Sequence, residues 1–386
     1  MAKMKKVAGA FLAVALGAAL FPAAGVSAAK SEAVVNPGTD QIIVKMKPSK
    51  VDQTAAVAAK AGASVKKAID GNLKVLKVAD GNVGDALAKV QADPNVEYAE
   101  LDQIMKIDLT PNDPSYSSQW HLPKIQAPAA WNITTGSTST KIAIIDTGVD
   151  LTHPDLSAKI IGGYNAITGT TNAQDDHGHG THCAGIATAS TDNNLNGAGV
   201  DWKARIMPVK VLDAGGSGYT SDIINGVNWA VANGANIISM SLGGGAANAS
   251  FQTAINNAWA NNVVIVAAAG NNGNTVKHYP AAYNNVVAVG STDSADNRSS
   301  FSTYGSWVHV GAPGSSILST RLGGGMTTMS GTSMATPVVA GLAGLVRANN
   351  PSLSNAGIVS KIFSGADPIG VPGWWQYGRV NALNSL

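Results

Sequence analysis

From residue 109 to the C-terminus, short apolar runs alternate with Ala-rich amphipathic stretches, and glycine clusters separate the two. The clearest runs cover residues 141–145, 206–211, 237–240, 263–267 and 286–290. Each is too apolar to leave one face in water, as is typical of strands in parallel sheets that are covered on both sides. We therefore predict an α/β fold here: a doubly wound, mostly parallel sheet with helices on both faces.

The composition changes before residue 109, where residues 30–108 are richer in Lys, Val, Ala and Asp. Extended patterns alternate with helical ones and predict the order β-α-β-β-α-β or a truncation of it, with a turn at residues 70–72. The extended patterns lie at 41–47, 73–78 and 96–107, and the helical ones at 51–61 and 83–91. We expect a separate, small α+β domain of the ferredoxin-like type, a fold that by itself indicates no function.

The N-terminus predicts a secretory signal peptide over residues 1–29. Three lysines among the first six residues precede an apolar stretch at 7–21 and a run of small residues at 26–29. A membrane anchor is the alternative, but this stretch is short for a bilayer span of about 20 residues. We expect a secreted, extracellular protein without stable membrane association.

The overall composition limits partners and covalent cross-links. With 386 residues and 45% hydrophobic content, the chain can bury a sizeable core in two or three folding units. Its 26 basic and 24 acidic residues leave a net charge of +2 with no basic patch, so we expect no nucleic-acid partner. Cys183 is the only cysteine, so no disulfide can form within the chain, and stability must come from packing and bound ions.

Three polar residues stand at positions that suit acid, base and nucleophile. Asp146 ends an apolar strand, where a capping role in a turn is the alternative. His179 follows a glycine loop at the start of a small-residue helix, and the helix dipole is expected to lower its pKa and keep it neutral; a structural or metal-binding histidine is the alternative. Ser333 opens a strongly helical segment whose first N–H groups could hold an oxyanion.

The chain order of these residues separates the classes of serine hydrolase. The order Asp, His, Ser differs from that of α/β-hydrolases and of chymotrypsin-like enzymes. No histidine follows Ser333, so an α/β-hydrolase using this serine has no base. The blocks DTG at 146–148, HGTHCAG at 179–185 and GTSMATP at 331–337 resemble those of the subtilisin family, and of its thermitase-like group most closely.

The resemblance covers residues 109–386 and implies a serine endopeptidase. It assigns the nucleophile to Ser333, the general base to His179 and the orienting carboxylate to Asp146. It also implies an oxyanion donor at Asn271, which lies in a glycine-flanked segment that would otherwise be interpreted as a turn.

Two glycine-rich stretches match the family's substrate-binding edges, where an extended peptide can pair with the backbone. Without the resemblance, each would be an ordinary turn. The implied binding residues are Gly216, Ser217, Gly218, Ser241, Leu242 and Gly243. Recognition through main-chain atoms predicts broad specificity toward protein and peptide substrates.

The family also implies at least one structural calcium ion, held by hard oxygen ligands. Its side-chain ligands fall on Asp113, Asp155 and Asn193, and its carbonyl ligands fall on Ser190, Leu195 and Gly197. A second calcium site would lie within 165–174, but Asn165, Thr168 and Thr170 stand where carboxylates are needed, so we expect it to be weak or absent. A third cation position aligns with His309 and is doubtful for the same reason.

The domain at 30–108 resembles the family's propeptide, an intramolecular chaperone and inhibitor. The resemblance predicts that the chain cuts itself near Asp108 and releases a catalytic domain at 109–386, which we expect to be a monomer.

Three other interpretations remain open at this point. A zinc hydrolase could use His177, His179 and His182 with Asp175 or Asp176, although no H-E-x-x-H motif is present. A binding protein could retain an inactive protease scaffold. Cys183, one helical turn after His179, could replace the serine as nucleophile, although a thiol inside a helix usually behaves as a small apolar residue.

Overall fold

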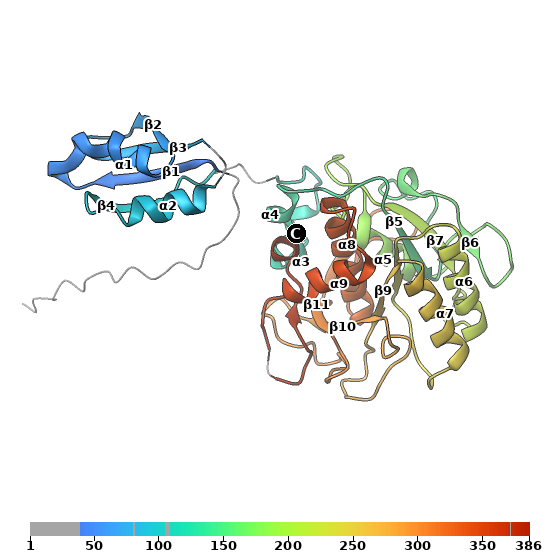
Figure 1. The fold of residues 1–386 in the computed structure, drawn as a ribbon. Coiled ribbons are helices and arrows are strands. Elements are labelled where there is room, and N and C mark those ends of the chain that lie inside the picture. Colours follow the sequence, from blue (N-terminus) through green and yellow to red (C-terminus); the bar gives the residue numbers. More distant parts are fainter. Residues whose placement is uncertain (1–38, 80–81, 105–108, 371) are drawn as a thin grey trace, which may run out of the picture. The chain divides into compact units, whose positions relative to one another are not determined.

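The computed structural model describes residues 39–79, 82–104, 109–370 and 372–386. The chain divides into two compact units, residues 1–105 and 106–386 (Figure 1). The predicted signal peptide at 1–29 and the predicted cleavage near Asp108 lie outside the described residues. Within the described part, no helix is both long and apolar enough to cross a membrane.

The N-terminal unit has the complete β-α-β-β-α-β order. Its elements are β1 (Gln41–Met46), a 3₁₀ turn η1 (Pro48–Gln53), α1 (Thr54–Lys60), β2 (Ala63–Ala68), β3 (Leu73–Val78), α2 (Val83–Gln91) and β4 (Val96–Leu101). The antiparallel sheet has the order β2-β3-β1-β4, and alternate residues Ile42, Val44 and Met46 pack with the helices in one core. Two bounds differ from the sequence prediction: the last strand ends at Leu101, and the first helix is a 3₁₀ turn up to Gln53.

The second unit is built on an eight-stranded sheet in which every pair of neighbours is parallel. Its strands are β5 (Lys141–Asp146), β6 (Tyr164–Asn165), β7 (Arg205–Lys210), β8 (Ile237–Met240), β9 (Val264–Ala268), β10 (Val287–Thr292), β11 (Val310–Pro313) and β14 (Gly378–Arg379). The order β14-β11-β10-β9-β8-β5-β7-β6 confirms the predicted doubly wound α/β fold. The chain winds from β5 to one edge of the sheet and then back past β5 toward the other edge, so β5 is the switch point where ligands bind in such folds.

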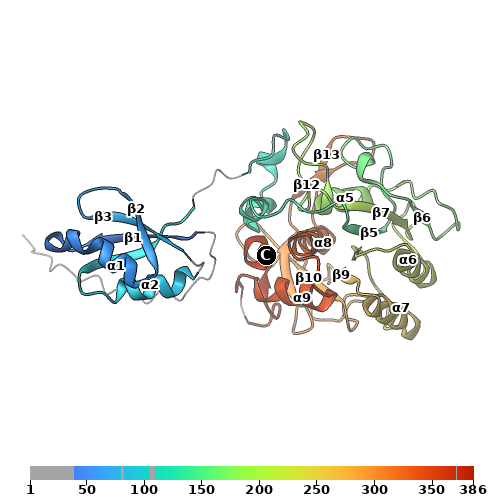
Figure 2. The ribbon, with the colours of Figure 1, turned by 45° about the horizontal axis from the view of Figure 1, so that its top comes forward.

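The two faces of the sheet face separate cores. Along β5, Ile142 and Ile144 join the core that contains α5 (His179–Thr188), α8 (Thr332–Asn349) and α9 (Asn355–Ser364). The intervening Ala143 and Ile145 join the core with α6 (Thr220–Ala232) and α7 (Ala249–Ala260). Figures 1 and 2 show α6 and α7 together on one side of the sheet, away from α8 and α9.

The helix α8 passes through the centre of its layer, and almost all of its residues from Thr332 to Val346 are buried. It packs closely on α5 at Gly341, where a Cβ atom would lie only 2.6 Å from the Ala187 carbonyl oxygen, so only glycine leaves enough room. This close packing fixes the first turns of α5 and α8 relative to the carboxyl ends of the strands.

Shorter elements complete the unit. They are η2 (Tyr116–Ser118), α3 (His121–Lys124), α4 (Ala127–Trp131), η3 (Ser157–Lys159), the antiparallel hairpin β12 (Ile317–Thr320) and β13 (Met326–Met329), and α10 (Ala382–Ser385).

Candidate active site

The catalytic dyad predicted from the sequence is assembled at the carboxyl end of β5. Asp146 is the last residue of β5 and is 1% exposed, and His179 is the first residue of α5. The Nδ1 atom of His179 lies 2.8 Å from Oδ1 of Asp146, which also accepts a hydrogen bond from the Thr147 amide at 2.8 Å. The imidazole is therefore held through one nitrogen, and the other is left for substrate chemistry.

The expected downward shift in the pKa of His179 is wrong. Burial is the largest single effect and favours the neutral ring, but the adjacent Asp146 carboxylate and Cys183 side chain together outweigh it and raise the pKa of His179 well above its usual value. A full negative charge 2.8 Å away acts more strongly than the partial charge of a helix terminus.

Ser333 occupies the first turn of α8, directly after the N-terminal residue Thr332. Its hydroxyl donates a hydrogen bond to the Ser241 carbonyl at 3.1 Å. The side chains of Ser333 and His179 line the same cleft. For Ser333 to attack a carbonyl, its hydroxyl must give up the hydrogen bond to the Ser241 carbonyl and transfer its proton to His179.

Asn271 lies beside the N-terminus of α8 and is locked in orientation. Its Oδ1 atom accepts hydrogen bonds from the Thr332 amide at 2.9 Å and from the Thr332 hydroxyl at 3.0 Å. A Cβ atom added to Gly331 would lie 3.4 Å from Nδ2 of Asn271 and 3.5 Å from the amide nitrogen of Ser333. Two N–H donors thus border one small space, the arrangement that an oxyanion requires.

A cleft of about 730 Å³ passes in front of these groups, and all six predicted substrate-binding residues line it. Gly216, Ser217 and Gly218 come from the segment before α6, and Ser241, Leu242 and Gly243 come from the segment after β8. Gly216 has φ +75°, a conformation in which a side chain would be strained. The two segments offer exposed backbone to an extended peptide.

Sequence reasoning missed His278, which also lines this cleft. Its ring fills the space beside Gly243 and Gly270, since a Cβ atom on either glycine would lie within about 3 Å of it. Burial lowers the pKa of His278. A single histidine in a polar loop has no periodicity or motif that could have identified it.

Cys183 is fully buried, one helical turn after His179. Its Sγ atom lies 4.0 Å from Nδ1 of His179 and 3.5 Å from the Ser333 carbonyl oxygen, and it does not line the cleft. Burial raises the pKa of the thiol, which favours the protonated, unreactive form. The geometry favours Ser333 over Cys183 as the nucleophile.

The zinc set proposed as an alternative does not converge. His182 is buried, with Nε2 at 3.1 Å from the carbonyl oxygens of both Ile317 and Thr327, whereas His177 is exposed at the cleft. Asp176 is paired with Lys210. Within the described ranges, the one cluster of three close metal-ligating side chains is Asp146, His179 and Cys183, and its first two members are already bonded to each other.

The predicted calcium ligands gather between the start of the catalytic unit and the loop after α5. The Asp113 carboxylate accepts hydrogen bonds from the amides of Asp192 and Asn193, at 2.8 and 3.1 Å. The Asn193 side chain donates to Oδ1 of Asp155 at 3.2 Å. The other carboxylate oxygen of Asp155 is buried and has no hydrogen-bond partner among the residues that the structure describes, which fits a hard cation at this place.

The carbonyl ligands Ser190, Leu195 and Gly197 belong to that same loop. The loop is held in an unusual path, because Asp192, Asn194 and Asn196 all have positive φ. Backbone carbonyl oxygens are among the ligands that calcium binds.

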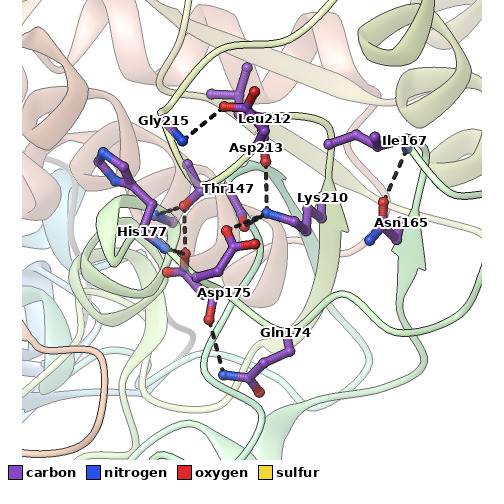
Figure 3. Close-up of polar contacts among 12 residues, drawn as sticks. Thr147, Asn165, Ile167, Gln174, Asp175, His177, Lys210, Leu212, Asp213 and Gly215 are labelled. Atoms are coloured by element: carbon purple, nitrogen blue, oxygen red, sulfur yellow. Dashed lines mark hydrogen bonds and ion pairs between the residues drawn. The ribbon is translucent and has the colours of Figure 1, made fainter.

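In the region of the second expected calcium site, the side chain of Asn165 accepts hydrogen bonds from the backbone. Oδ1 of Asn165 accepts the amide of Ile167 at 3.1 Å (Figure 3), and it also accepts the amide of Thr168 at 3.2 Å and so closes a turn. At the third position, Nδ1 of His309 accepts the Ala288 amide at 3.0 Å. The expectations that the second site is weak or absent and that the third is doubtful stay predictions.

Comparison with protein families gives two matches. The family model described as "Subtilase family" matches residues 137–376, and the model described as "Fervidolysin N-terminal prodomain" matches residues 24–102.

Comparison with individual proteins gives extensive similarity. Thermitase of Thermoactinomyces vulgaris is 52% identical over 279 residues, which cover 72% of this chain and 99% of thermitase. A thermophilic serine proteinase of Bacillus sp. (strain AK1) is 43% identical over 320 residues, covering 82% of this chain and 79% of the relative. A solved structure described as proteases from Pseudoalteromonas arctica PAMC 21717 matches with a TM-score of 0.67 and 33% identity, covering 72% of this chain and 98% of that chain.

Proposed function

The chain belongs to the subtilase family of serine-type endopeptidases and carries a prodomain, and from this we propose that Asp146, His179 and Ser333 are its catalytic triad. The observation that carries the proposal is the 2.8 Å contact between Asp146 and His179 at the edge of a cleft that Ser333 also lines.

In the proposed mechanism, a peptide lies in the cleft with its scissile carbonyl between Ser333 and the donors beside Gly331. His179 takes the Ser333 proton as the oxygen attacks, and the Asp146 carboxylate stabilises the imidazolium that forms. The amides of Asn271 and Ser333 hold the oxyanion. His179 then protonates the leaving amine, and water hydrolyses the acyl group on Ser333.

We further propose that the protein is a secreted precursor with a signal peptide at 1–29, an inhibitory propeptide at 30–108 and a catalytic domain at 109–386. The prodomain match at 24–102 supports the middle assignment. The secretory pattern of the first 29 residues supports the first, and the mature enzyme would act as an extracellular monomer. The exposed glycine-rich edges of the cleft support broad specificity toward unfolded protein segments.

Calcium is proposed as a structural ion at one site at least. Asp113, Asp155 and Asn193 would hold it with the carbonyls of Ser190, Leu195 and Gly197. The ion would stabilise the join between the N-terminal segment and the loop after α5 and would take no part in catalysis.

Covalent labelling tests the nucleophile and the maturation together. Secreted protein is treated with a fluorophosphonate, and intact and peptide masses are compared with those of Ser333→Ala. One adduct on the Ser333 peptide of a form that starts near Leu109 is the expected result, with the variant unlabelled and unprocessed. A wild-type protein that is processed but unlabelled would overturn the assignment.

A further inference from the structure

Asp175 is a buried carboxylate for which neither the family resemblance nor the proposed mechanism has a role. It is 3% exposed and lies in the loop before α5. Oδ1 accepts hydrogen bonds from the Thr147 hydroxyl at 2.8 Å and from the amides of His177 and Gly178 at 3.0 and 2.9 Å. Oδ2 accepts the amide and the hydroxyl of Thr181 at 2.9 and 2.6 Å.

These five bonds come from two pieces of backbone, the end of β5 and the continuous stretch that runs from the loop into α5. Thr147 follows Asp146 at the end of β5, His177 and Gly178 form the loop, and Thr181 is in the first turn of α5. In Figure 3, dashed lines run from the Asp175 carboxylate to the Thr147 side chain and to the backbone of His177. The carboxylate therefore joins the segment that carries the catalytic aspartate to the helix that carries the catalytic histidine.

The Thr147 hydroxyl completes this connection. While it donates to Asp175, its oxygen accepts the amide of Gly180 at 2.9 Å, next to His179. Gly178, with φ +101°, lets the loop turn into the helix so that its amide reaches the same carboxylate. Asp146 and His179 are thus each adjacent in sequence to a residue that Asp175 binds, Thr147 in the first case and Gly178 in the second.

The carboxylate is suited to this task because it is charged. Burial alone would raise the pKa of Asp175, but its hydrogen bonds, led by those from the Gly178 amide and the Thr181 side chain, hold the pKa below the usual value. An anion at the first turn of α5 also interacts favourably with the helix dipole. Hydrogen bonds to a charged acceptor are stronger than neutral ones, so the loop is held firmly.

Resting on the proposed triad, we propose that Asp175 is a positioning residue, whose carboxylate fixes the first turn of α5 against the end of β5 and thereby holds His179 on Asp146. Asp175 touches no substrate atom, since it does not line the cleft. It acts on turnover only through the placement of His179.

The test compares Asp175→Asn with Asp367→Asn. Asp367 also accepts several hydrogen bonds, from Arg379 and Asn381, and it does not line the cleft. Both full-length variants are matured, with a trace of wild-type enzyme where they do not mature alone, and active sites are counted from the fluorophosphonate adduct. We expect kcat of Asp175→Asn to fall by about 10- to 100-fold with KM almost unchanged, as for a small misplacement of a catalytic group.

A double-mutant cycle separates positioning from loss of stability. Thr147→Val removes the same connection from the β5 side, so the two kcat losses should not add in the double variant. All kinetics are measured well below the unfolding temperature of each variant. Equal kcat per active site in Asp175→Asn and wild type, or additive losses in the cycle, would overturn the inference. If wild type itself carried no adduct on Ser333, the proposed function would fail instead.

Discussion

Two histidines one helical turn apart in α5 have opposite electrostatic surroundings. His179 faces the Asp146 carboxylate, which raises its pKa despite burial. His182 points into the protein between two backbone carbonyls, and burial lowers its pKa to about 4. Both are histidines of the same helix only three residues apart, so the groups that each ring meets in the fold distinguish the proposed base from a structural ring.

The raised pKa of His179 predicts the acid side of the pH profile. His179 must be neutral to accept the Ser333 proton, so activity is lost as pH falls through its pKa, and half-maximal kcat/KM should occur above pH 6.5. In Asp146→Asn this midpoint should move to lower pH, and kcat should fall by about 10⁴-fold. The measurement is kcat/KM against pH for both proteins; an unchanged midpoint in the variant would contradict the role of Asp146.

The same pair affects stability in the opposite direction along the pH scale. Because the folded-state pKa of His179 is raised, the stabilisation from its charged form is fully present below about pH 6.5 and is lost as pH rises through the folded pKa. Activity and this part of the stability therefore favour different ends of the same pH range.

A second prediction concerns His121, which is fully buried with no hydrogen-bond partner on either ring nitrogen among the described residues. Burial lowers the pKa of His121 to about 3, so below pH 6.5 the unfolded chain binds a proton that the folded chain does not. At pH 5 this costs about 2 kcal/mol of the free energy of unfolding. His121→Phe should therefore lose less stability than wild type between pH 7 and pH 5, in urea titrations of fluorophosphonate-inactivated enzyme. An equal loss in both proteins would show that His121 binds protons in the folded state.

At the scale of elements, the N-terminus of α8 would supply the proposed nucleophile Ser333 and one of the two proposed oxyanion donors, the Ser333 amide, while Asn271 would supply the other. Gly331 has φ 161°, which is extended backbone that alanine also adopts, so Gly331→Ala should fold normally. Its Cβ atom would contact both Asn271 Nδ2 and the Ser333 amide and would fill the space for the oxyanion. We expect kcat to fall by about 100-fold, comparable to the loss of one oxyanion donor, with little change in the unfolding temperature. A variant with normal kcat would place the oxyanion elsewhere.

The buried ammonium group of Lys210 holds the turn after β7 in place through hydrogen bonds to backbone carbonyls. Lys210 donates to the carbonyls of Thr147 and Leu212 at 2.8 Å each and pairs with Asp176 at 2.7 Å (Figure 3). Lys210→Met leaves two carbonyls unpaired, which should cost about 1–3 kcal/mol for each, and it loosens the segment that leads to the substrate edge at 215–218. We expect a several-fold rise in KM in peptide hydrolysis, and the exposed lysine variant Lys203→Met serves as the control. A KM equal to that of the control would show that the edge is held by other contacts.

Elements with a strong pattern were predictable, and short ones were not. All five apolar runs are strands of the parallel sheet because a strand covered on both faces needs apolar residues on both. The two-residue strands β6 and β14 and the hairpin β12–β13 carry no such pattern, since they are defined by neighbours distant in the sequence. In the candidate site, sequence motifs identified Asp146, His179 and Ser333. The proposed role of Asp175 depends on its hydrogen bonds to Thr147 and Thr181, which form only in the folded chain.

At the scale of the whole molecule, the proposed calcium site joins the beginning of the catalytic unit to its interior. Asp113 precedes every strand of the main sheet, yet its carboxylate binds the amides of Asp192 and Asn193, which follow α5. A chelator should therefore lower the unfolding temperature by several degrees, since an ion at 100 times its Kd contributes about 2.7 kcal/mol. Asp155→Asn should show a smaller response to the chelator. Calorimetry with and without chelator measures both, and identical responses would place the ion elsewhere.

The position of α8 late in the chain also determines when the protein could first cleave its own polypeptide. The residues before α8 already contain Asp146, His179 and the walls of the cleft, but they lack Ser333. A chain that is made from its N-terminus can therefore fold its N-terminal unit first. With Ser333 as the proposed nucleophile, it could not cut a peptide bond until α8 has packed against the sheet. If Ser333 is the nucleophile, as proposed, peptide-bond cleavage could begin only after α8 is in place, when most of the core-forming segments of the same chain have already been made.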